Sequence, residues 1–200
     1  MNLMFKISYG LYLLAANDGN RDNACMINTF MQQTNLPETF SVTVNKTNLT
    51  HDMIAKSKKC VVAILSTSTK FETIKNFGMQ SGKTTNKFDG VAAERAQNGV
   101  LVATDGVIGY FELDVESSVD MGTHTMFILK ATANKVLADG EPLTYGYYQS
   151  NIKPKPQPIA TDKKERWICR ICGYIYEGSL PADFICPICK HPASDFERLD

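Results

Sequence analysis

Short apolar runs recur along most of the chain, and their spacing is that of β-strands. Many of their residues are β-branched or aromatic, several runs alternate with polar positions, and Gly, Asn or Asp separates them. The Asp18-Gly19 and Asp105-Gly106 pairs lie between neighbouring runs and predict hairpin turns. The predicted strands cover residues 5–16, 24–33, 39–44, 60–65, 100–104, 107–115 and 123–131.

Two segments show helical signals instead. One begins near Thr50 and covers residues 50–58; the other covers residues 70–77, with Ser68 or Thr69 as its N-cap and Gly78 at its end. Many short strands with few helices predict a mainly β fold, built as a closed or nearly closed barrel.

A proline-rich stretch predicts the domain boundary. Prolines at positions 154, 156 and 158 remove backbone donors and favour an extended, semi-rigid spacer. We therefore predict a domain at residues 1–150, a linker at 151–164 and a small module at 165–200.

The small module carries two cysteine pairs, Cys169–Cys172 and Cys186–Cys189, each with two residues between the thiols. Two tight turns of this kind can bring four sulfurs to one ion, and a tetrahedral S4 site usually holds zinc or iron. Residues 165–200 are too few to bury a self-sufficient core, so metal binding is expected to supply much of the folding free energy.

The amino-terminal run raises the question of compartment. Lys6 and the apolar residues 11–16 faintly resemble a signal peptide, but a single lysine and the interrupting segment 8–10 favour a strand. The protein is then expected to be cytoplasmic, where paired cysteines indicate a metal site rather than disulfides. Cys25 and Cys60 lie far from the pairs and are expected to be small buried residues.

Composition excludes several function classes. The chain has 21 basic and 21 acidic residues and no basic run interleaved with aromatics, which argues against nucleic acid as a partner. No window approaches 18 uninterrupted apolar residues, so no membrane span is expected. Ser81-Gly82-Lys83-Thr84 matches only the end of a phosphate-binding P-loop, and the earlier glycine of that motif is missing.

Several segments of the large domain together resemble the flavin reductase-like family of FMN-binding split barrels. What this resemblance implies is a homodimer that holds FMN non-covalently near the subunit interface. The segments that carry it are residues 9–15, 28–34, 42–50, 75–78, 81–82, 87–89, 122–125 and 142–145, together with Pro37.

The resemblance also implies positions for the flavin. Backbone groups along residues 24–34 would meet the ring and the ribityl chain, and a second group would meet the phosphate. The ring residues are Cys25, Asn28, Thr29 and Phe30, and the phosphate residues are Lys46, Asn48 and Thr50. A lysine beside a helix N-terminus is a reasonable anion site on physical grounds, although Thr50 would equally serve only as a helix cap.

Further residues are implied around the ring. His124 stands where relatives that use a pyridine nucleotide place a histidine near the nicotinamide, although the usual acidic neighbour is replaced by Thr123. The alternative is a structural histidine at a strand start. A loop over the flavin would include Phe77, Gly78, Ser81 and Gly82, and Lys87 and Phe88 would close over the nucleotide.

The small module resembles rubredoxin, and specifically the abbreviated rubredoxin module of rubrerythrins. A zinc ribbon can share its cysteine spacing. Iron is favoured by an aromatic shell, by backbone N–H groups, including those of Gly173 and Lys190, placed to donate to the sulfurs, and by a neighbouring flavin domain. His191 cannot add to a closed four-ligand site. The shell residues are Trp167, Tyr174, Tyr176, Phe184 and Phe196.

The order of the two domains resembles that of the high-molecular-weight rubredoxins of anaerobic bacteria. This implies an NAD(P)H:rubredoxin oxidoreductase in which FMN takes two electrons from NAD(P)H. An iron ion held by the four cysteines would pass them singly to an acceptor protein, such as a flavo-diiron reductase of oxygen or nitric oxide. Two alternatives stay open at this point: a carrier that another protein reduces, and a zinc-ribbon interaction protein.

Overall fold

The structure is a computed structural model that describes residues 3–154 and 165–199. It divides into two compact units, Met1–Pro154 and Lys155–Asp200, which are described separately below. The first unit continues past the predicted end at residue 150, because a π-helical turn, η2, occupies Tyr148–Ile152. Most of the predicted linker lies outside the described residues.

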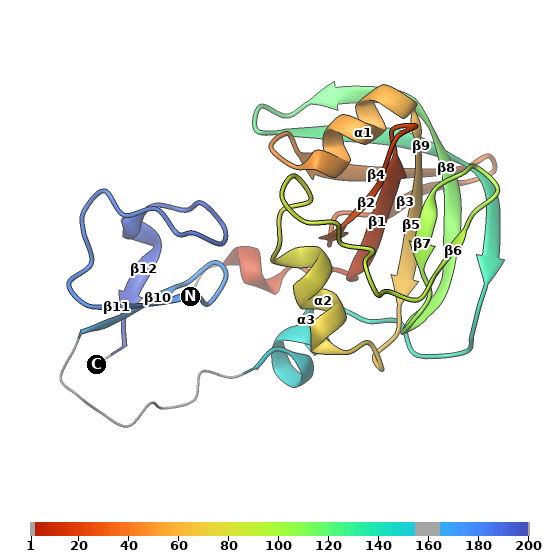
Figure 1. The fold of residues 1–200 in the computed structure, drawn as a ribbon. Helices are drawn as coiled ribbons and strands as arrows, with labels where there is room; N and C mark the ends of the chain where they lie inside the picture. The colour runs from red at the N-terminus through yellow and green to blue at the C-terminus, as the bar shows by residue number, and fades with distance from the viewer. Residues whose placement is uncertain (1–2, 155–164, 200) are drawn as a thin grey trace. The chain divides into compact units, whose positions relative to one another are not determined.

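A seven-stranded sheet with the order β2-β1-β5-β8-β9-β4-β3 forms the large unit (Figure 1). Every neighbouring pair in it is antiparallel, and β8 and β9 form its longest hairpin. The strands are β1 (Tyr12–Asn17), β2 (Asp22–Ile27), β3 (Met31–Asn35), β4 (Glu38–Asn45), β5 (Lys59–Leu65), β8 (Val107–Asp120) and β9 (His124–Val136).

Strand β1 is buried on both faces of this sheet. Leu13 and Ala15 join one core cluster, and Leu14 and Ala16 join the other, because successive side chains on a strand point to opposite faces. This is why the strand is continuously apolar rather than alternating. The cluster of Leu13 includes Ile74 and Phe77 of helix α2 (Phe71–Gly78), and the cluster of Leu14 includes Met53 and Ile54 of helix α1 (Leu49–Ser57).

Three predicted strand features differ from the structure. The run at 5–16 begins with a 3₁₀ helix, η1 (Leu3–Lys6), and the run at 24–33 is two strands, because the chain leaves the sheet at residues 28–30. Asp18-Gly19 does connect paired strands. Asp105-Gly106 does not, because β7 (Leu101–Ala103) pairs with β6 (Ala93–Arg95) in a separate sheet.

The two helices form close to the predicted places but with different caps. The N-cap of α1 is Asn48, whose side chain accepts a hydrogen bond from the Thr50 N–H. Helix α2 follows Lys70, which provides no side-chain cap, so neither Ser68 nor Thr69 is the N-cap. A short turn, α3 (Tyr145–Tyr147), precedes η2.

The carboxylate of Asp22 connects the small sheet β6–β7 to the large one. Arg95 on β6 donates to both of its oxygens at 3.2 and 3.0 Å, and the Leu101 N–H donates at 3.0 Å. Asn17 adds a fourth hydrogen bond at 2.8 Å. Burial opposes ionisation of this carboxyl, but the Arg95, Asn17 and Leu101 hydrogen bonds outweigh it and lower the pKa of Asp22.

Asp22→Asn is therefore expected to lower the free energy of unfolding at pH 7 by about 1.5 to 3 kcal/mol, the usual value of hydrogen bonds to a charged group. Because the folded pKa of Asp22 lies below the unfolded value, the carboxylate stabilises the fold above that unfolded value, and this stabilisation is lost as pH falls through the folded pKa. Urea unfolding at pH 7 and at pH 3 measures this. An equal difference between the two proteins at both pH values would contradict the assignment.

The small unit is a three-stranded antiparallel sheet, β11-β10-β12, with the cysteine turns at its end. Its elements are β10 (Arg166–Cys169), β11 (Ile175–Glu177), the 3₁₀ helix η3 (Ala193–Asp195) and β12 (Phe196–Arg198). Among its described residues, 165–199, only Cys169, Cys186 and Phe196 are buried. Across residues 3–154 and 165–199, no helix is long and apolar enough to cross a membrane.

Candidate metal centre and flavin site

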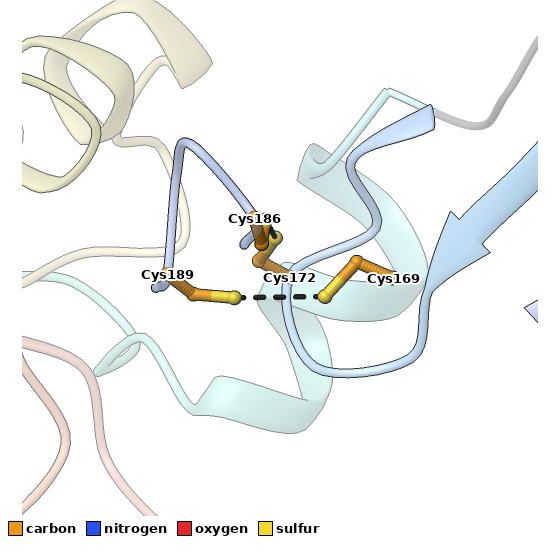
Figure 2. Close-up of side chains that lie close together, drawn as sticks. All are labelled: Cys169, Cys172, Cys186 and Cys189. Atoms are coloured by element: carbon orange, nitrogen blue, oxygen red, sulfur yellow. Dashed lines mark hydrogen bonds between the residues drawn. The ribbon is translucent and has the colours of Figure 1, made fainter. Parts of the chain in front are cut away.

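The four paired cysteines come together at one point of the small unit (Figure 2). Their sulfurs all lie within 4.8 Å of one another, and the Sγ–Sγ distances are 3.5 Å for Cys169–Cys189 and for Cys172–Cys186. A tetrahedral site with metal–sulfur bonds of about 2.3 Å has edges of about 3.8 Å. The donor set therefore fits a single S4-bound zinc or iron ion.

The two cysteine turns have the same backbone hydrogen bonds. In the first, the Cys169 N–H donates to the Tyr174 carbonyl at 2.8 Å and the Gly173 N–H donates to the Cys169 carbonyl at 2.8 Å. In the second, the Cys186 N–H donates to the His191 carbonyl at 2.8 Å and the Lys190 N–H donates to the Cys186 carbonyl at 2.9 Å. The site is thus enclosed by two equivalent turns.

The predicted donors to sulfur were wrong, because the Gly173 and Lys190 N–H groups both donate to carbonyl oxygens. The N–H groups that face sulfur include those of Tyr174, at Cys172, and His191, at Cys189. At Cys186, burial opposes the thiolate, but the backbone N–H groups of Cys189 and Ile188 outweigh it and lower the pKa of the thiol. Donation from backbone N–H groups stabilises the more negative, reduced form of a sulfur-ligated metal.

Each turn ends on a residue in the left-handed region, and only one of the two is glycine. Gly173 has φ 78° and Lys190 has φ 62°. This conformation costs a residue with a Cβ about 1 kcal/mol. Lys190→Gly is therefore expected to stabilise the module by about 1 kcal/mol and to slow metal release to a chelator by about fivefold. Gly173→Ala should destabilise the module and speed metal release. Faster metal release from Lys190→Gly than from the parent protein would contradict a strained backbone at Lys190.

Aromatic rings cover the sheet side of the metal centre, as the sequence predicts. Phe184 contacts Tyr176 at 4.6 Å and Phe196 at 5.4 Å between ring centroids, and Tyr174 meets Phe196 edge-on at 6.5 Å. Trp167 packs against the same cluster, and its indole N–H is buried with no acceptor within the described residues. This shell limits access of water to the metal.

In the large unit, a buried polar cluster forms where β2 meets the start of α1. The Asn23 side chain donates to the Thr50 hydroxyl at 2.8 Å, and both residues are almost fully buried. The Thr50 and Asn48 side chains also act on the Cys25 thiol, and both favour a lower pKa for it. Complete burial outweighs these contacts and raises the pKa of Cys25. Cys60 is buried elsewhere in the core, as predicted.

The Lys87 ammonium group lies beneath the same strand. The residue is 3% exposed, and its ammonium group donates to the Ala24 carbonyl at 3.1 Å and to the Phe77 carbonyl at 2.9 Å. Burial lowers the pKa of Lys87, and the nearby Cys25 thiol raises it less. Lys87 thus connects the end of α2 to β2.

The segment after α2 covers β2 closely. Adding a Cβ at Gly82 would bring it within 2.2 Å of the Asn23 side-chain oxygen, and a Cβ at Gly78 would meet Met26 at 3.0 Å. The Asn23 oxygen is buried and has no hydrogen-bond partner among the described residues. A glycine cradle over an unpaired acceptor fits a polar flavin edge, whose ring N–H could donate there. Phe77 is buried and Ser81 is exposed at the surface.

The remaining predicted flavin residues lie around the ends of β3, β4 and β9. The Thr29 hydroxyl donates to the Thr43 carbonyl at 2.7 Å. Phe30 is buried and stacks on Phe40 at 4.9 Å, and Asn28 is half-buried. Lys46 forms an ion pair with Asp120 at 2.7 Å.

His124 is half-buried at the start of β9, opposite Asn45 on β4. Its Nδ1 lies 2.8 Å from the Thr123 hydroxyl. Sequence reasoning missed Asn23, the residue that joins β2 to α1. The sequence signal that could have identified Asn23 is a polar residue placed directly before the apolar residues of a strand that is buried on both faces.

Comparisons with known proteins agree with these two sites. Residues 4–155 match the flavin reductase like domain, and residues 167–197 match the rubrerythrin, rubredoxin-like domain. The chain is 33% identical to high molecular weight rubredoxin from Moorella thermoacetica over 221 residues, covering 96% of each protein.

Two further similarities fall on the large unit. The chain is 36% identical to ferric-chelate reductase (NAD(P)H) from Archaeoglobus fulgidus over 157 residues, covering 78% of this chain and 93% of that protein. The structure of flavin reductase PheA2 superposes with a TM-score of 0.61 at 26% identity, covering 72% of this chain and 88% of that one.

The fold and the two sites thus define an oxidoreductase that joins a mainly β, flavin-binding split barrel to an iron module with four cysteine ligands. The chain belongs to the flavin reductase-like family and carries a rubredoxin-like domain at its C-terminal end. Its cofactors are FMN and one iron ion, and the prediction of a four-cysteine site is confirmed by the geometry of the four sulfurs.

Proposed function

We propose that this protein takes electrons from NAD(P)H at the flavin domain and delivers them singly, through its cysteine-bound iron, to an external acceptor protein. The observation that carries this proposal is the presence of a flavin reductase-like domain and a rubredoxin-like S4 site on one chain. When bound, FMN supplies the exchange between a two-electron donor and one-electron steps. A relative named as an NAD(P)H-dependent reductase supports the choice of donor.

The proposed flavin contacts follow β2, the start of α1 and the segment after α2. The ring and ribityl chain are assigned to Cys25, Asn28, Thr29 and Phe30, with Phe77, Gly78, Ser81 and Lys87 around them, and the phosphate to Lys46, Asn48 and Thr50. His124 is proposed to meet the nicotinamide. Support comes from the unpaired Asn23 oxygen beneath Gly82, which lies among these residues.

We also propose that the large unit forms a homodimer. Every residue of β3 is exposed, and large apolar side chains are exposed on β3 and at the turn of the β8–β9 hairpin, including Met31, Val119 and Met121. An exposed edge strand with apolar side chains favours pairing with another chain.

The partial exposure of the metal centre supports an external acceptor. Cys172 and Cys189 are only partly buried, so their sulfurs approach the protein surface. We propose that the acceptor is a redox protein, such as a flavo-diiron reductase of oxygen or nitric oxide, which docks there and takes one electron at a time.

Anoxic titration of the natively expressed protein with NADH and NADPH tests this proposal. The expected result is bleaching of the flavin band and then of the ferric thiolate band with at least one nucleotide. If a partner reductase bleaches these bands and neither nucleotide does, the protein is an electron carrier rather than an enzyme that oxidises NAD(P)H. Absence of a ferric thiolate band in natively expressed protein would identify a zinc ribbon instead.

A further inference from the structure

A cavity of about 530 Å³ lies between the β1–β2 turn and the segment at residues 83–88. Its volume is in the range of small-molecule sites. It adjoins the proposed flavin site, because Asn23 and Gly82, which meet there, directly follow and precede the lining segments.

The lining of this cavity is cationic. Arg21 and Lys83 are both exposed, and neither forms an ion pair with another residue in the described part of the chain. One Arg21 nitrogen donates to the Gly82 carbonyl, which holds the guanidinium beside the lining segment that begins at Lys83. A guanidinium and an ammonium group on one cavity favour a phosphate.

The one carboxylate in the lining is already engaged. Asp22 accepts two hydrogen bonds from Arg95, one from Asn17 and one from the Leu101 N–H. It therefore has little capacity left to accept from a ribose hydroxyl, and its charge is neutralised by Arg95. The net charge that a ligand meets in this cavity is positive.

The other lining groups are compatible with the remaining parts of a nucleotide. Phe88, which is mostly buried against Phe77, and Leu101 add apolar atoms that a base can contact. Thr84 and Thr85 supply hydroxyl groups for a sugar or a phosphate. A ligand with one aromatic ring system, a sugar and at least one phosphate matches this arrangement.

We propose that this cavity binds the adenosine end of the pyridine dinucleotide and that Arg21 and Lys83 recognise a 2′-phosphate, so that the protein prefers NADPH to NADH. The proposal rests on the nucleotide oxidation proposed above and adds its specificity. The same chemistry would also fit the phosphate of the flavin itself, and the experiment separates the two sources.

The holoprotein and its Arg21→Gln, Lys83→Gln and double variants are compared in steady-state oxidation of NADPH and NADH. The expected KM for NADPH rises about tenfold in each single variant, since each loses a hydrogen bond to a charged group, whereas the KM for NADH and both kcat values stay within twofold. Arg21→Lys should restore part of the NADPH affinity. Lys56→Gln removes an exposed charge of α1 that lies outside the cavity and is the matched control.

Equal KM changes for both nucleotides, or no NADPH preference in the parent protein, would overturn the assignment. A fall in FMN affinity of the variants, measured by flavin fluorescence, would assign the cavity to the flavin phosphate instead and would also overturn it. If neither nucleotide reduces the flavin, the function proposal fails. Calorimetric titration with 2′,5′-ADP and 5′-AMP still tests the cavity assignment in that case. Tighter binding of 2′,5′-ADP than of 5′-AMP, lost in both single variants, supports the assignment. Equal binding of the two ligands refutes it.

Discussion

Cys186→Ala is expected to abolish iron binding and to stop electron exit while leaving flavin reduction intact. The substitution leaves three thiolates, and within residues 165–199 only Cys169, Cys186 and Phe196 are buried. Because metal binding supplies most of the folding free energy of such a unit, its loss should unfold the module. We expect the ferric thiolate absorption to vanish and the rate of acceptor reduction to fall by at least about 100-fold.

Reduction of the flavin by NAD(P)H, followed by stopped-flow absorbance, should stay within twofold in this variant, because the large unit has its own two core clusters. His191→Gln is the matched control. Among the described residues, its side chain forms a hydrogen bond with the Cys189 carbonyl at 3.1 Å, and the backbone N–H that faces the Cys189 sulfur is retained in the variant. Retained iron in Cys186→Ala, or lost iron in His191→Gln, would show that the ligand set is different.

Lys87→Met is expected to destabilise the large unit by about 2 to 4 kcal/mol and to weaken flavin binding. The methionine fills a similar volume but leaves the Ala24 and Phe77 carbonyls without their donor, and an unsatisfied buried acceptor costs about 1 to 3 kcal/mol. The β2 backbone beside the proposed flavin ring then loses its connection to α2. Urea unfolding and FMN titration of the same preparation measure the two effects.

The pH dependence of this difference separates a buried charge from simple packing. Burial lowers the pKa of Lys87 in the folded protein below its ordinary value of 10.5, so unfolding takes up a proton between the two values. The wild type should therefore gain stability over Lys87→Met as pH rises through that window. Lys75→Met, at an exposed position of α2, is the control, and a pH-independent difference for Lys87→Met would argue against a buried ammonium group.

Features encoded by local spacing were predictable from the sequence. The two cysteine pairs specify their own turns, because two intervening residues fix how a tight turn can present both sulfurs. The β4 and β5 strands also appear where their β-branched runs predict them. In these segments the residues that determine the structure lie next to each other in the chain.

Features that depend on distant contacts were not predictable. The apolar pattern of residues 24–33 gives no sign of the break at 28–30, which the Thr29–Thr43 hydrogen bonds hold in place. A lysine in a polar loop suggests exposure, yet Lys87 is buried because two carbonyls from β2 and α2 converge on it. Asn48 and Thr50 both have side chains that commonly cap helices, and only the geometry selects Asn48 as the N-cap of α1.

The alternation of burial among the four cysteine ligands affects how electrons can be transferred to and from the iron. The first cysteine of each pair is buried and the second is partly exposed, so each of the two equivalent turns contributes one sulfur near the surface. These two sulfurs lie within 4.8 Å of each other, so they share one small area of the surface. A docked protein covers far more than this area, so we expect an electron donor and an electron acceptor to use it in turn rather than together.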